Sequence, residues 1–362
     1  MGKKYLRMTC AALATVALGA ILGFDWRASG TRDDFFLGGI QVNEPDHEHW
    51  VRTLQSSGMN TVSVTVYAHQ GDWDTDHLWF DEDNDAVLNE IRTAKAAGLK
   101  VVLILRVALD HAFEANRFLW HGMIQPRTPE MVESWFRQYS EFAARWGRIA
   151  QAEGVDLLGI ASEMNELTST LPLTELPPLH EYYLNEEKQE AYRERLLAQG
   201  AGIADHHLRL PGSEEEPSLE AFLDARQGTY RRWAEQVAGA DEEAALIAMN
   251  ERRRLLDAQW IRLIREMRRV YTGPLTYAAN FDQYHEVGFW QHLDVLSINA
   301  YFPLRRRWGP EAHPEFSMLL EAGWRRTLAG IVRFRQDQGL EDLPVVFSEL
   351  GYTRVQGCTL EP

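Results

Sequence analysis

The sequence predicts an α/β fold of the (β/α)8 TIM-barrel class for most of its 362 residues. Apolar segments of strand character alternate along the chain with amphipathic segments of helical spacing. Several helical segments end on a glycine that leads directly into the next strand, as in AAGLKVVLIL and AEGVDLLGI. This order of helix, glycine and buried strand is typical of βαβ units and a parallel sheet. The chain is also long enough for one barrel, which needs roughly 250 residues.

The first half of the chain contains four predicted strands. Residues 61–67 (TVSVTVY) are rich in β-branched side chains, and residues 100–105 (KVVLIL) are almost continuously apolar, as expected for a strand buried on both faces. The helix at 128–154 begins with Thr-Pro-Glu and ends on glycine, which are a helix start and a helix stop. The other elements expected in this half are strands at 35–40 and 155–160 and helices at 44–58 and 84–98.

Residues 168–245 interrupt this pattern, because they contain no convincing buried strand. A proline-rich stretch (LPLTELPPL) and a charged, helix-prone stretch (NEEKQEAYRERLLAQ) predict a helical insertion, either a solvated decoration or a lid over the barrel. The pattern then resumes with helices at 248–271 and 316–339 and strands at 275–279, 295–299 and 345–348. Only 13 residues follow Glu349. We therefore expect an eighth strand that is missing or truncated.

Residues 1–30 are expected to be a signal peptide or an N-terminal membrane anchor, which leaves residues 31–362 for the barrel. This segment begins with the basic residues Lys3, Lys4 and Arg7. The uncharged, mostly apolar run at 8–24 follows, and its 17 residues are at the short limit of a bilayer span. We therefore expect the folded part to lie outside the cytoplasm, whether secreted, periplasmic or membrane-anchored. Contact with a membrane is expected through the N-terminal segment alone.

Composition excludes several classes of function. The net charge of −16 makes binding to nucleic acid or anionic lipid unfavourable, and it suits a neutral substrate or simply solubility. Cys10 lies in the N-terminal apolar run, so it cannot pair with Cys358 inside the folded domain. The glycine motifs that bind nucleotides and the G-x-S-x-G motif of serine hydrolases are absent from the sequence. We expect a monomer without a nucleic-acid partner.

Two predicted strands end in the same dipeptide, Ser-Glu. Glu163 follows the strand at 155–160 in GIASEM, and Glu349 follows the strand at 345–348 in VVFSEL. Active sites of these barrels lie at the carboxyl ends of the strands, and strands four and seven lie on opposite sides of the barrel mouth. The two carboxylates can therefore converge. Such a pair suits a retaining glycosidase, in which carboxyl groups about 5–5.5 Å apart act as nucleophile and as general acid and then base.

The two carboxylates need different protonation states for this chemistry. The general acid needs a raised pKa, whereas the nucleophile must stay ionised. Glu166 is an alternative acid/base residue, because MNEL offers an Asn-Glu pair three residues further on. Arg106 and Tyr301 are candidates to tune the nucleophile through charge or a hydrogen bond. The residues expected to bind substrate behind the strands are Arg106, Asp110, Trp120, Asn280, Asn299, Tyr301 and Tyr352.

The histidines do not indicate a metal site. His69, His111 and His121 lack H-E-x-x-H or another close ligand spacing, so we expect neither a metal nor another cofactor. Aromatic residues are frequent near the strand ends, and aromatic side chains pack on the apolar C–H faces of sugar rings. A polysaccharide or oligosaccharide is therefore the expected substrate.

Four segments resemble glycoside hydrolase family 113, whose characterised members are β-mannanases of clan A. They are GVDLLGIASEMNEL, LTYAANFDQY, FWQHLDVLSINAYFPL and LPVVFSELGYTR, at strands four to seven. The resemblance extends from about residue 33 to the end of the chain, apart from the insertion. It implies a barrel glycosidase in which Glu163 is the acid/base residue and Glu349 is the nucleophile. By the same resemblance, Asn280 and Tyr301 line the site.

The third strand departs from the family pattern. Arg106 and Ala108 stand near the places where a lysine and a histidine are expected, and arginine and lysine are not interchangeable at such a site. The function that the sequence favours is a retaining glycoside hydrolase that cleaves a β-linked polysaccharide or oligosaccharide, with β-mannan as a candidate. The alternative is a catalytically inactive barrel that binds an exported polysaccharide at the cell surface.

Overall fold

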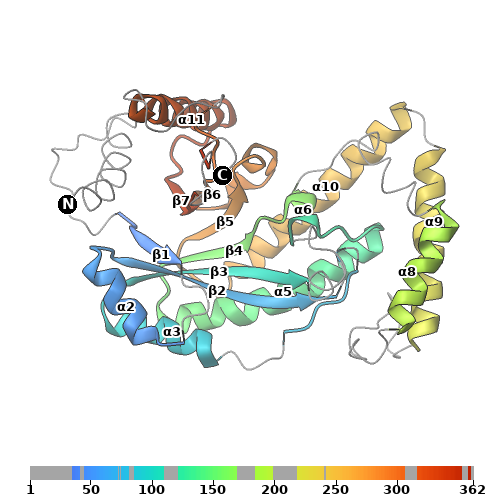
Figure 1. Cartoon of the computed structure of the whole chain (residues 1–362), viewed down its shortest axis with the longest axis horizontal. Coiled ribbons are helices and arrows are strands. Elements are labelled where there is room, and N and C mark those ends of the chain that lie inside the picture. The colour runs from blue at the N-terminus through green and yellow to red at the C-terminus, as the bar shows by residue number, and fades with distance from the viewer. Residues whose placement is uncertain are drawn as a thin grey trace.

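Seven parallel strands form a single sheet in chain order and curl into a nearly closed barrel (Figure 1). The computed structural model describes residues 35–40, 45–71, 73, 75–80, 85–109, 121–168, 184–198, 218–239, 242–305, 316–352 and 358–359. The strands are β1 (Gly38–Ile40), β2 (Thr61–Gln70), β3 (Lys100–Leu109), β4 (Leu157–Ser162), β5 (Leu275–Asn280), β6 (Val295–Asn299) and β7 (Val345–Glu349). In the described residues β1 and β7 are the two edges of the sheet. The predicted (β/α)8 TIM-barrel class is confirmed, and the sheet has seven strands within the described residues.

Helices between the strands cover the outside of the sheet. The longer ones are α2 (His47–Ser56), α3 (Asp85–Ala96), α5 (Pro129–Glu153), α10 (Glu242–Met267) and α11 (Phe316–Gln338). The short ones are η2 (His121–Met123), α6 (Asn165–Thr168), η6 (Tyr284–Glu286) and η7 (Trp290–His292). The predicted ends of α5 are confirmed, because the Thr128 side chain accepts a hydrogen bond from the Met131 N–H and Gly154 adopts a left-handed conformation with φ 66°.

Successive side chains of β3 point to opposite faces of the sheet, so they belong to two different apolar layers. Val101, Leu103 and Leu105 belong to the main core between the sheet and the helices. The interior of the barrel holds a smaller cluster, formed by Val102, Ile104, Leu157 and Val295. Arg106 lies two residues beyond Ile104 and therefore continues the interior face of β3 toward the mouth of the barrel.

Buried aromatic residues fix the end of β4 from outside. The Tyr139 hydroxyl of α5 donates to the Ile160 carbonyl at 2.8 Å, and the Trp260 indole N–H of α10 donates to the Leu167 carbonyl at 2.7 Å. Both rings are completely buried, and they meet edge to face with centroids 6.3 Å apart. Ring pairs of this kind stabilise a core beyond their buried area. The β4–α6 segment is therefore supported by two long helices.

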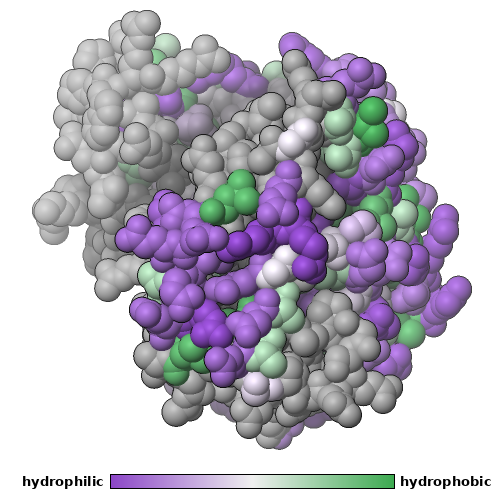
Figure 2. Space-filling model, turned by 90° about the vertical axis from the view of Figure 1, so that its right-hand side faces the viewer, coloured by the Kyte–Doolittle hydropathy of each residue, from purple (hydrophilic) through white to green (hydrophobic). Residues whose placement is uncertain are grey.

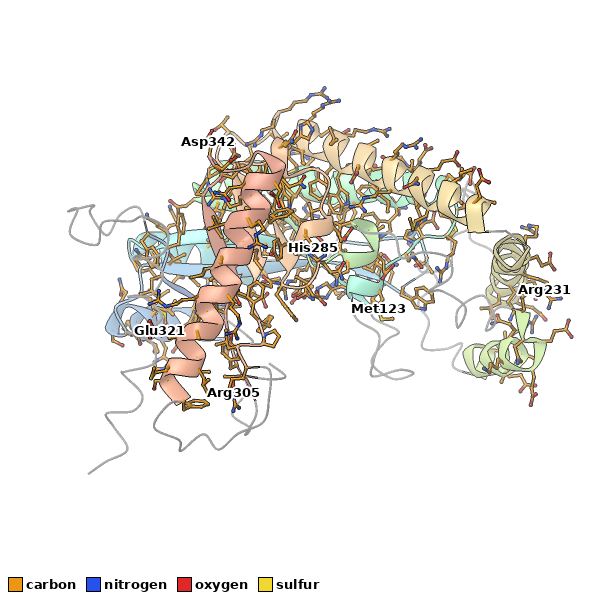
Figure 3. All side chains as sticks on the ribbon, turned by 90° about the horizontal axis from the view of Figure 1, so that it is seen from above. Met123, Arg231, His285, Arg305, Glu321 and Asp342 are labelled. Atoms are coloured by element: carbon orange, nitrogen blue, oxygen red, sulfur yellow. The ribbon has the colours of Figure 1, made fainter. Side chains whose placement is uncertain are left out.

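The described residues of the insertion are helical, as predicted. It contains α8 (Glu186–Ala198) and α9 (Leu219–Ala238), and α10 begins at Glu242, before the predicted start at residue 248. Arg193 joins α8 to α9 through Asp224 at 2.9 Å and Glu220 at 3.3 Å. Figures 1 and 3 show this pair, with Arg231, at the far end of α10, well away from Met123 of η2 at the barrel. Whether the insertion is a lid or a decoration stays a prediction.

The outer face of the molecule at the insertion is mainly hydrophilic. Figure 2 shows hydrophilic residues over most of the described surface on this side, interrupted by small apolar patches. Exposed apolar side chains in this region include Leu184, just before α8, Leu197 in α8 and Ile247 in α10. No helix in the described part of the chain is long and apolar enough to cross a bilayer. The predicted signal peptide or anchor at residues 1–30 lies outside the described residues.

Candidate active site

The carboxyl ends of four strands bring together the polar side chains of the candidate site. Arg106 projects from β3, Asn299 is the last residue of β6, and Glu349 is the last residue of β7. Glu163 comes directly after Ser162, the last residue of β4. These strand ends share the mouth of the barrel, which is where the active sites of this fold class lie.

Both glutamates follow an irregularity in strand pairing. The register of β4 against β5 shifts between Gly159 and Ser162. On β7, Ser348 is an extra residue, because its two neighbours pair with consecutive residues of β6. One extra residue in a strand is the pattern of a β-bulge, which bends the strand and redirects the next side chain. On β7 the redirected residue is Glu349. On β4 the irregularity ends at Ser162, the residue directly before Glu163.

The backbone of Glu163 is strained. It is the only non-glycine residue in the described part of the chain with a positive φ, at 52°, a conformation that side chains with a Cβ rarely adopt. Its N–H donates to the Ala278 carbonyl at 2.8 Å, and the N–H of Met164 donates to the Tyr277 hydroxyl at 2.8 Å. The neighbouring strand therefore holds this conformation, and such strain concentrates at functional sites.

Glu163 is 9% exposed, and its carboxyl group contacts two donors. The Asn299 amide N–H donates to Oε1 at 2.9 Å, and His121 Nε2 lies 3.2 Å from Oε2. Burial raises the pKa of Glu163, but the hydrogen bonds from His121 and Asn299 and the positive charges of His121 and Arg106 outweigh it, so the pKa is lowered. The raised pKa expected for a general acid is therefore absent from the free site.

The Glu349 carboxyl group contacts a different pair of donors. The Tyr301 hydroxyl donates to Oε2 at 2.5 Å, and Arg106 Nη2 forms an ion pair with Oε1. Burial and the negative charge of Glu163 raise the pKa of Tyr301, with the Arg106 charge opposing them. Tyr301 therefore stays protonated and can donate, and together with Arg106 it stabilises the negative charge of Glu349.

A single buried amide connects the two Ser-Glu dipeptides. Asn299 is completely buried; besides Glu163, its N–H donates to the Ser162 hydroxyl at 3.3 Å. The Ser348 hydroxyl donates to the Asn299 carbonyl oxygen at 2.8 Å. The serines thus have a role that the sequence did not reveal, because they fix Asn299 between β4 and β7.

Electrostatic coupling also shows that the two glutamates belong to one site. The Arg106 charge lowers the pKa of Glu163, and the Glu163 charge raises the pKa of Tyr301. Arg106 and Tyr301 are the same two residues that contact Glu349. The structure therefore brings together five of the predicted residues: Glu163, Glu349, Arg106, Asn299 and Tyr301.

The other predicted site residues are placed differently. The Asn280 side chain accepts a hydrogen bond from the Phe281 N–H at 2.9 Å, and the Tyr352 hydroxyl donates to the Phe302 carbonyl at 2.9 Å. These bonds order the loops behind β5 and β7 and do not involve the glutamates. Asp110 and Trp120 lie outside the described residues.

Glu166 belongs to a second polar cluster, on α6. Its Oε2 accepts a hydrogen bond from the Gln125 amide at 3.1 Å. Burial raises the pKa of Glu166, and the charges of Arg252 and Arg127 offset this only in part. Its pKa thus suits an acid/base residue better than that of Glu163 does, but its recorded contacts are with this cluster and not with the partners of Glu349.

His121 is the residue at the glutamate pair that the sequence interpretation missed, since it was weighed only as a metal ligand. It lies at the start of η2, beyond the end of β3, where strand periodicity gives no signal. His69 packs against Trp79 with ring centroids 6.1 Å apart. Among the residues that the structure describes, no three histidine, cysteine or carboxylate side chains gather where a metal ion could bind.

Solved structures of similar fold are β-mannanases. A GH113 β-1,4-mannanase and its complex are each 18% identical to this chain, cover 90% of it and 74% of their own length, and have a TM-score of 0.52. The GH113 β-mannanase AaManA from Alicyclobacillus acidocaldarius, in complex with ManMIm, is 16% identical, with 92% and 76% covered and a TM-score of 0.54. No curated protein matches the chain. At these identities the similarity establishes the barrel fold.

The sequence model of one family matches more than two thirds of the chain. The model describes Glycoside Hydrolase Family 113 and matches residues 39–170 and 242–362. The gap between these two matches coincides with the helical insertion, and both glutamates lie inside the matched residues. This chain belongs to glycoside hydrolase family 113, and it is a glycoside hydrolase whose substrate is a carbohydrate.

Proposed function

We propose that this protein hydrolyses a β-linked glycan with retention of configuration, with Glu349 as nucleophile and Glu163 as acid and then base. The observation that supports this proposal most directly is that two carboxylates at one barrel mouth contact different donor groups. Glu349 contacts the donors Arg106 and Tyr301, whereas Glu163 contacts Asn299 and His121. β-Mannan is the first candidate substrate, because the similar solved structures are β-mannanases.

In the first step, the Glu349 carboxylate attacks the anomeric carbon of the sugar and forms a glycosyl–enzyme ester. The bond from that carbon to the leaving oxygen breaks, and Glu163 gives its proton to this oxygen. Each carboxylate oxygen has two acceptor sites. Glu349 therefore keeps a lone pair for attack while Arg106 and Tyr301 hold its orientation.

Glu163 needs a proton for this step, although its pKa is lowered in the free site. Burial is the largest single influence on that pKa and acts to raise it. A bound sugar excludes more water and strengthens this influence. We infer that Glu163 therefore carries its proton when the sugar is bound.

In the second step, water attacks the anomeric carbon from the face that the leaving group vacated. Glu163, now ionised, takes a proton from this water, and Glu349 leaves as a carboxylate. Two inversions give net retention. Asn299 contacts Oε1 of Glu163 at 2.9 Å and so keeps the carboxyl group in place through both steps.

We also propose that the enzyme acts outside the cytoplasm. The apolar run at residues 8–24, with basic residues before it, supports export or anchoring. N-terminal sequencing of the protein from a membrane-free fraction tests this. Cleavage of the segment would give a mature protein that lacks these residues.

The direct test is hydrolysis of β-mannan, glucomannan and other β-glycans by the purified protein, with Glu349→Gln as its matched variant. We expect reducing ends to form with the wild type and almost none with the variant, and proton NMR to show the β-anomer as the first product. Undiminished hydrolysis by Glu349→Gln would exclude this nucleophile. Glycan binding without turnover, equal in both proteins, would instead support the inactive-barrel alternative.

A further inference from the structure

β2 carries aromatic side chains on the face that points into the barrel. Val64, Val66 and Ala68 belong to the main core between the sheet and the helices. Because successive side chains of a strand alternate between its faces, Tyr67 and His69 lie on the opposite, interior face. Both residues are in the last four of β2, so they lie toward the mouth of the barrel, where the active sites of this fold class are found.

A third ring continues this face beyond the strand. Trp79 pairs with His69 in an antiparallel bridge through two backbone hydrogen bonds of 2.8 Å and 3.0 Å. Side chains directly opposite each other in such a pair lie on one face, and these two rings stack with centroids 6.1 Å apart. The next residue, Phe80, packs on the other side, against Phe142 of α5. Tyr67, His69 and Trp79 therefore share one face, and we call them the aromatic strip.

Tyr67 joins the aromatic strip to the candidate active site. Its partner in the register of β2 and β3 is Arg106, which forms the ion pair with Glu349. Arg106 also lies on the interior face of the barrel, as described above. Since neighbouring strands are about 4.8 Å apart, two paired residues that share a face lie side by side. The strip thus begins beside a side chain that contacts the nucleophile.

From Tyr67 the aromatic strip leads away from the acid/base residue. At His69, the β3 edge of β2 is occupied by Ala108. Trp79 must therefore pair with His69 from the other edge, which is the side of β2 that faces away from β3 and β4. Glu163 follows β4. A ligand on the strip consequently extends along the mouth of the barrel, beyond the space between the two glutamates.

The ring of Tyr67 is open to solvent. The residue is 42% exposed, and it makes no hydrogen bond or ring contact within the part of the chain that the structure describes. Trp79 is also partly exposed. A single exposed apolar residue needs no explanation, but this one belongs to a row of three rings that begins at the catalytic groups.

We propose that the aromatic strip is a binding platform for a sugar unit other than the one that is cleaved, and that Tyr67 stacks on the apolar face of that unit. This inference rests on the proposed function, because it extends the same site. It narrows the substrate class to β-glycans of several units, since a glycoside with one sugar would leave the strip empty.

The chemistry of the aromatic strip fits a neutral glycan. The C–H groups of a β-linked pyranose form an apolar face, on which aromatic side chains pack. Tyrosine and tryptophan have only two side-chain torsions, so they lose little conformational entropy when a ligand binds. Tyr67 is also part of a paired strand, and sites built on strands hold their geometry better than sites on loops.

The experiment is calorimetric titration of the full chain with β-1,4-mannohexaose and with cellohexaose. Every protein carries Glu349→Gln, so that the probes stay intact. Tyr67→Ala removes the ring, Tyr67→Leu keeps apolar volume without a flat ring, and Tyr67→Phe keeps the ring. The matched control is Phe35→Ala, because Phe35 is 53% exposed but lies before β1, where its carbonyl accepts a hydrogen bond from Asn60, at the opposite end of the barrel.

We expect at least one hexasaccharide to bind the parent protein and the Phe35→Ala control equally. Its affinity should fall about tenfold in Tyr67→Ala and Tyr67→Leu and stay within about threefold in Tyr67→Phe. Equal affinity of Tyr67→Ala and the control would overturn the platform, and so would the absence of hexasaccharide binding. A loss in Tyr67→Phe as large as in Tyr67→Ala would overturn the stacking role of the ring.

Steady-state kinetics of Tyr67→Ala with Glu349 intact supply a second readout. A contact with a remote sugar unit is the same in the ground state and the transition state, so its loss should raise KM for β-mannan and leave kcat unchanged. A fall in kcat at unchanged KM would overturn the remote position. If the wild type were inactive but hexasaccharide binding still depended on Tyr67, the proposed hydrolysis would be wrong and the platform would be supported.

Thermal melting of each variant without ligand checks that it is folded. Because Tyr67 is exposed, Tyr67→Leu should melt within a few degrees of the parent protein. Tyr67→Leu therefore tests the platform even if Tyr67→Ala weakens the strand. A Tyr67→Leu protein that is folded and binds hexasaccharide as tightly as the Phe35→Ala control would overturn the proposal.

Discussion

The ends of β4 and β7 present the same dipeptide in two different environments. Glu349 lies between Arg106 and Tyr301, a permanent cation and a protonated hydroxyl. Glu163 lies between Asn299 and His121, an amide and an imidazole. One carboxylate contacts a permanent cation, whereas the contacts of the other are an amide and an imidazole. A retaining mechanism requires such unlike environments for its two carboxylates.

The backbone adds to the contrast between the two strand ends. Glu163 has φ 52°, and its N–H donates to the carbonyl of Ala278 in β5. Glu349, by contrast, is the last residue of β7. Asn299 connects both ends through Ser162 and Ser348. The separation of roles therefore depends on the side chains around each carboxylate and not on the local sequence, which is Ser-Glu in both places.

The largest effect is expected from Glu349→Gln, because it removes the group that forms the covalent intermediate. We expect kcat on β-mannan to fall on the order of 10⁴- to 10⁶-fold, as when other enzymes lose their nucleophile. Circular dichroism of the variant provides the control for folding. A loss of kcat smaller than that of Glu163→Gln would contradict the roles proposed for the two glutamates.

Glu163→Gln should have the next largest effect, because it removes a proton donor and acceptor but leaves the nucleophile. We expect a loss of about 10²- to 10⁴-fold on β-mannan. The loss should be smaller on an aryl glycoside whose leaving group needs no proton. Equal losses on both substrates would argue against an acid role for Glu163.

Tyr301→Phe tests the hydrogen bond to Glu349 while keeping the ring. One hydrogen bond to a charged group should cost about 10- to 100-fold in kcat/KM. Steady-state kinetics on the same β-mannan sample measure this. An unchanged value would show that Arg106 alone is sufficient to hold the nucleophile.

Glu166→Gln separates the two candidates for the acid/base role. Because Glu166 contacts Gln125 and feels the charges of Arg127 and Arg252, its loss should lower kcat/KM less than about tenfold, well below the effect at Glu163. A loss as large as that of Glu163→Gln, with the same dependence on leaving group, would transfer the acid/base role to Glu166.

The smallest effect is a shift in pH dependence in His121→Phe. His121 lowers the pKa of Glu163 through a hydrogen bond and a charge, so its removal raises this pKa. Glu163 then keeps its proton to higher pH, and the alkaline limb of the kcat/KM profile, which reports the free enzyme, should move to higher pH. A limb that stays in place or moves to lower pH would contradict the coupling.

The strands and the two glutamates could be predicted from the sequence because both depend on local order. Apolar runs that end in Ser-Glu locate the carboxyl ends of β4 and β7, and a barrel brings these ends to one mouth. The role of His121 could not be predicted in this way. It reaches Glu163 from η2, and strand periodicity does not specify the path of the chain from β3 to that point.

The lowered pKa of Glu163 could not be predicted either. The expectation of a raised pKa rested on what a general acid needs, and burial does raise the pKa of Glu163. The opposing donors come from β6 and η2, far from Glu163 along the chain. The start of α10 at Glu242, ahead of the predicted position, has a simpler cause: the residues before 248 read EEAALI and are good helix formers.

The most direct test is covalent labelling of the wild-type protein with 2-deoxy-2-fluoro-β-mannosyl fluoride, followed by peptide mass spectrometry. The fluorine slows the second step, so the glycosyl ester accumulates on the nucleophile. We expect the added mass on the peptide that contains Glu349, and none on that peptide in Glu349→Gln. A label on the peptide that carries Glu163 and Glu166, or hydrolysis of β-mannan with inversion and no label, would contradict the mechanism.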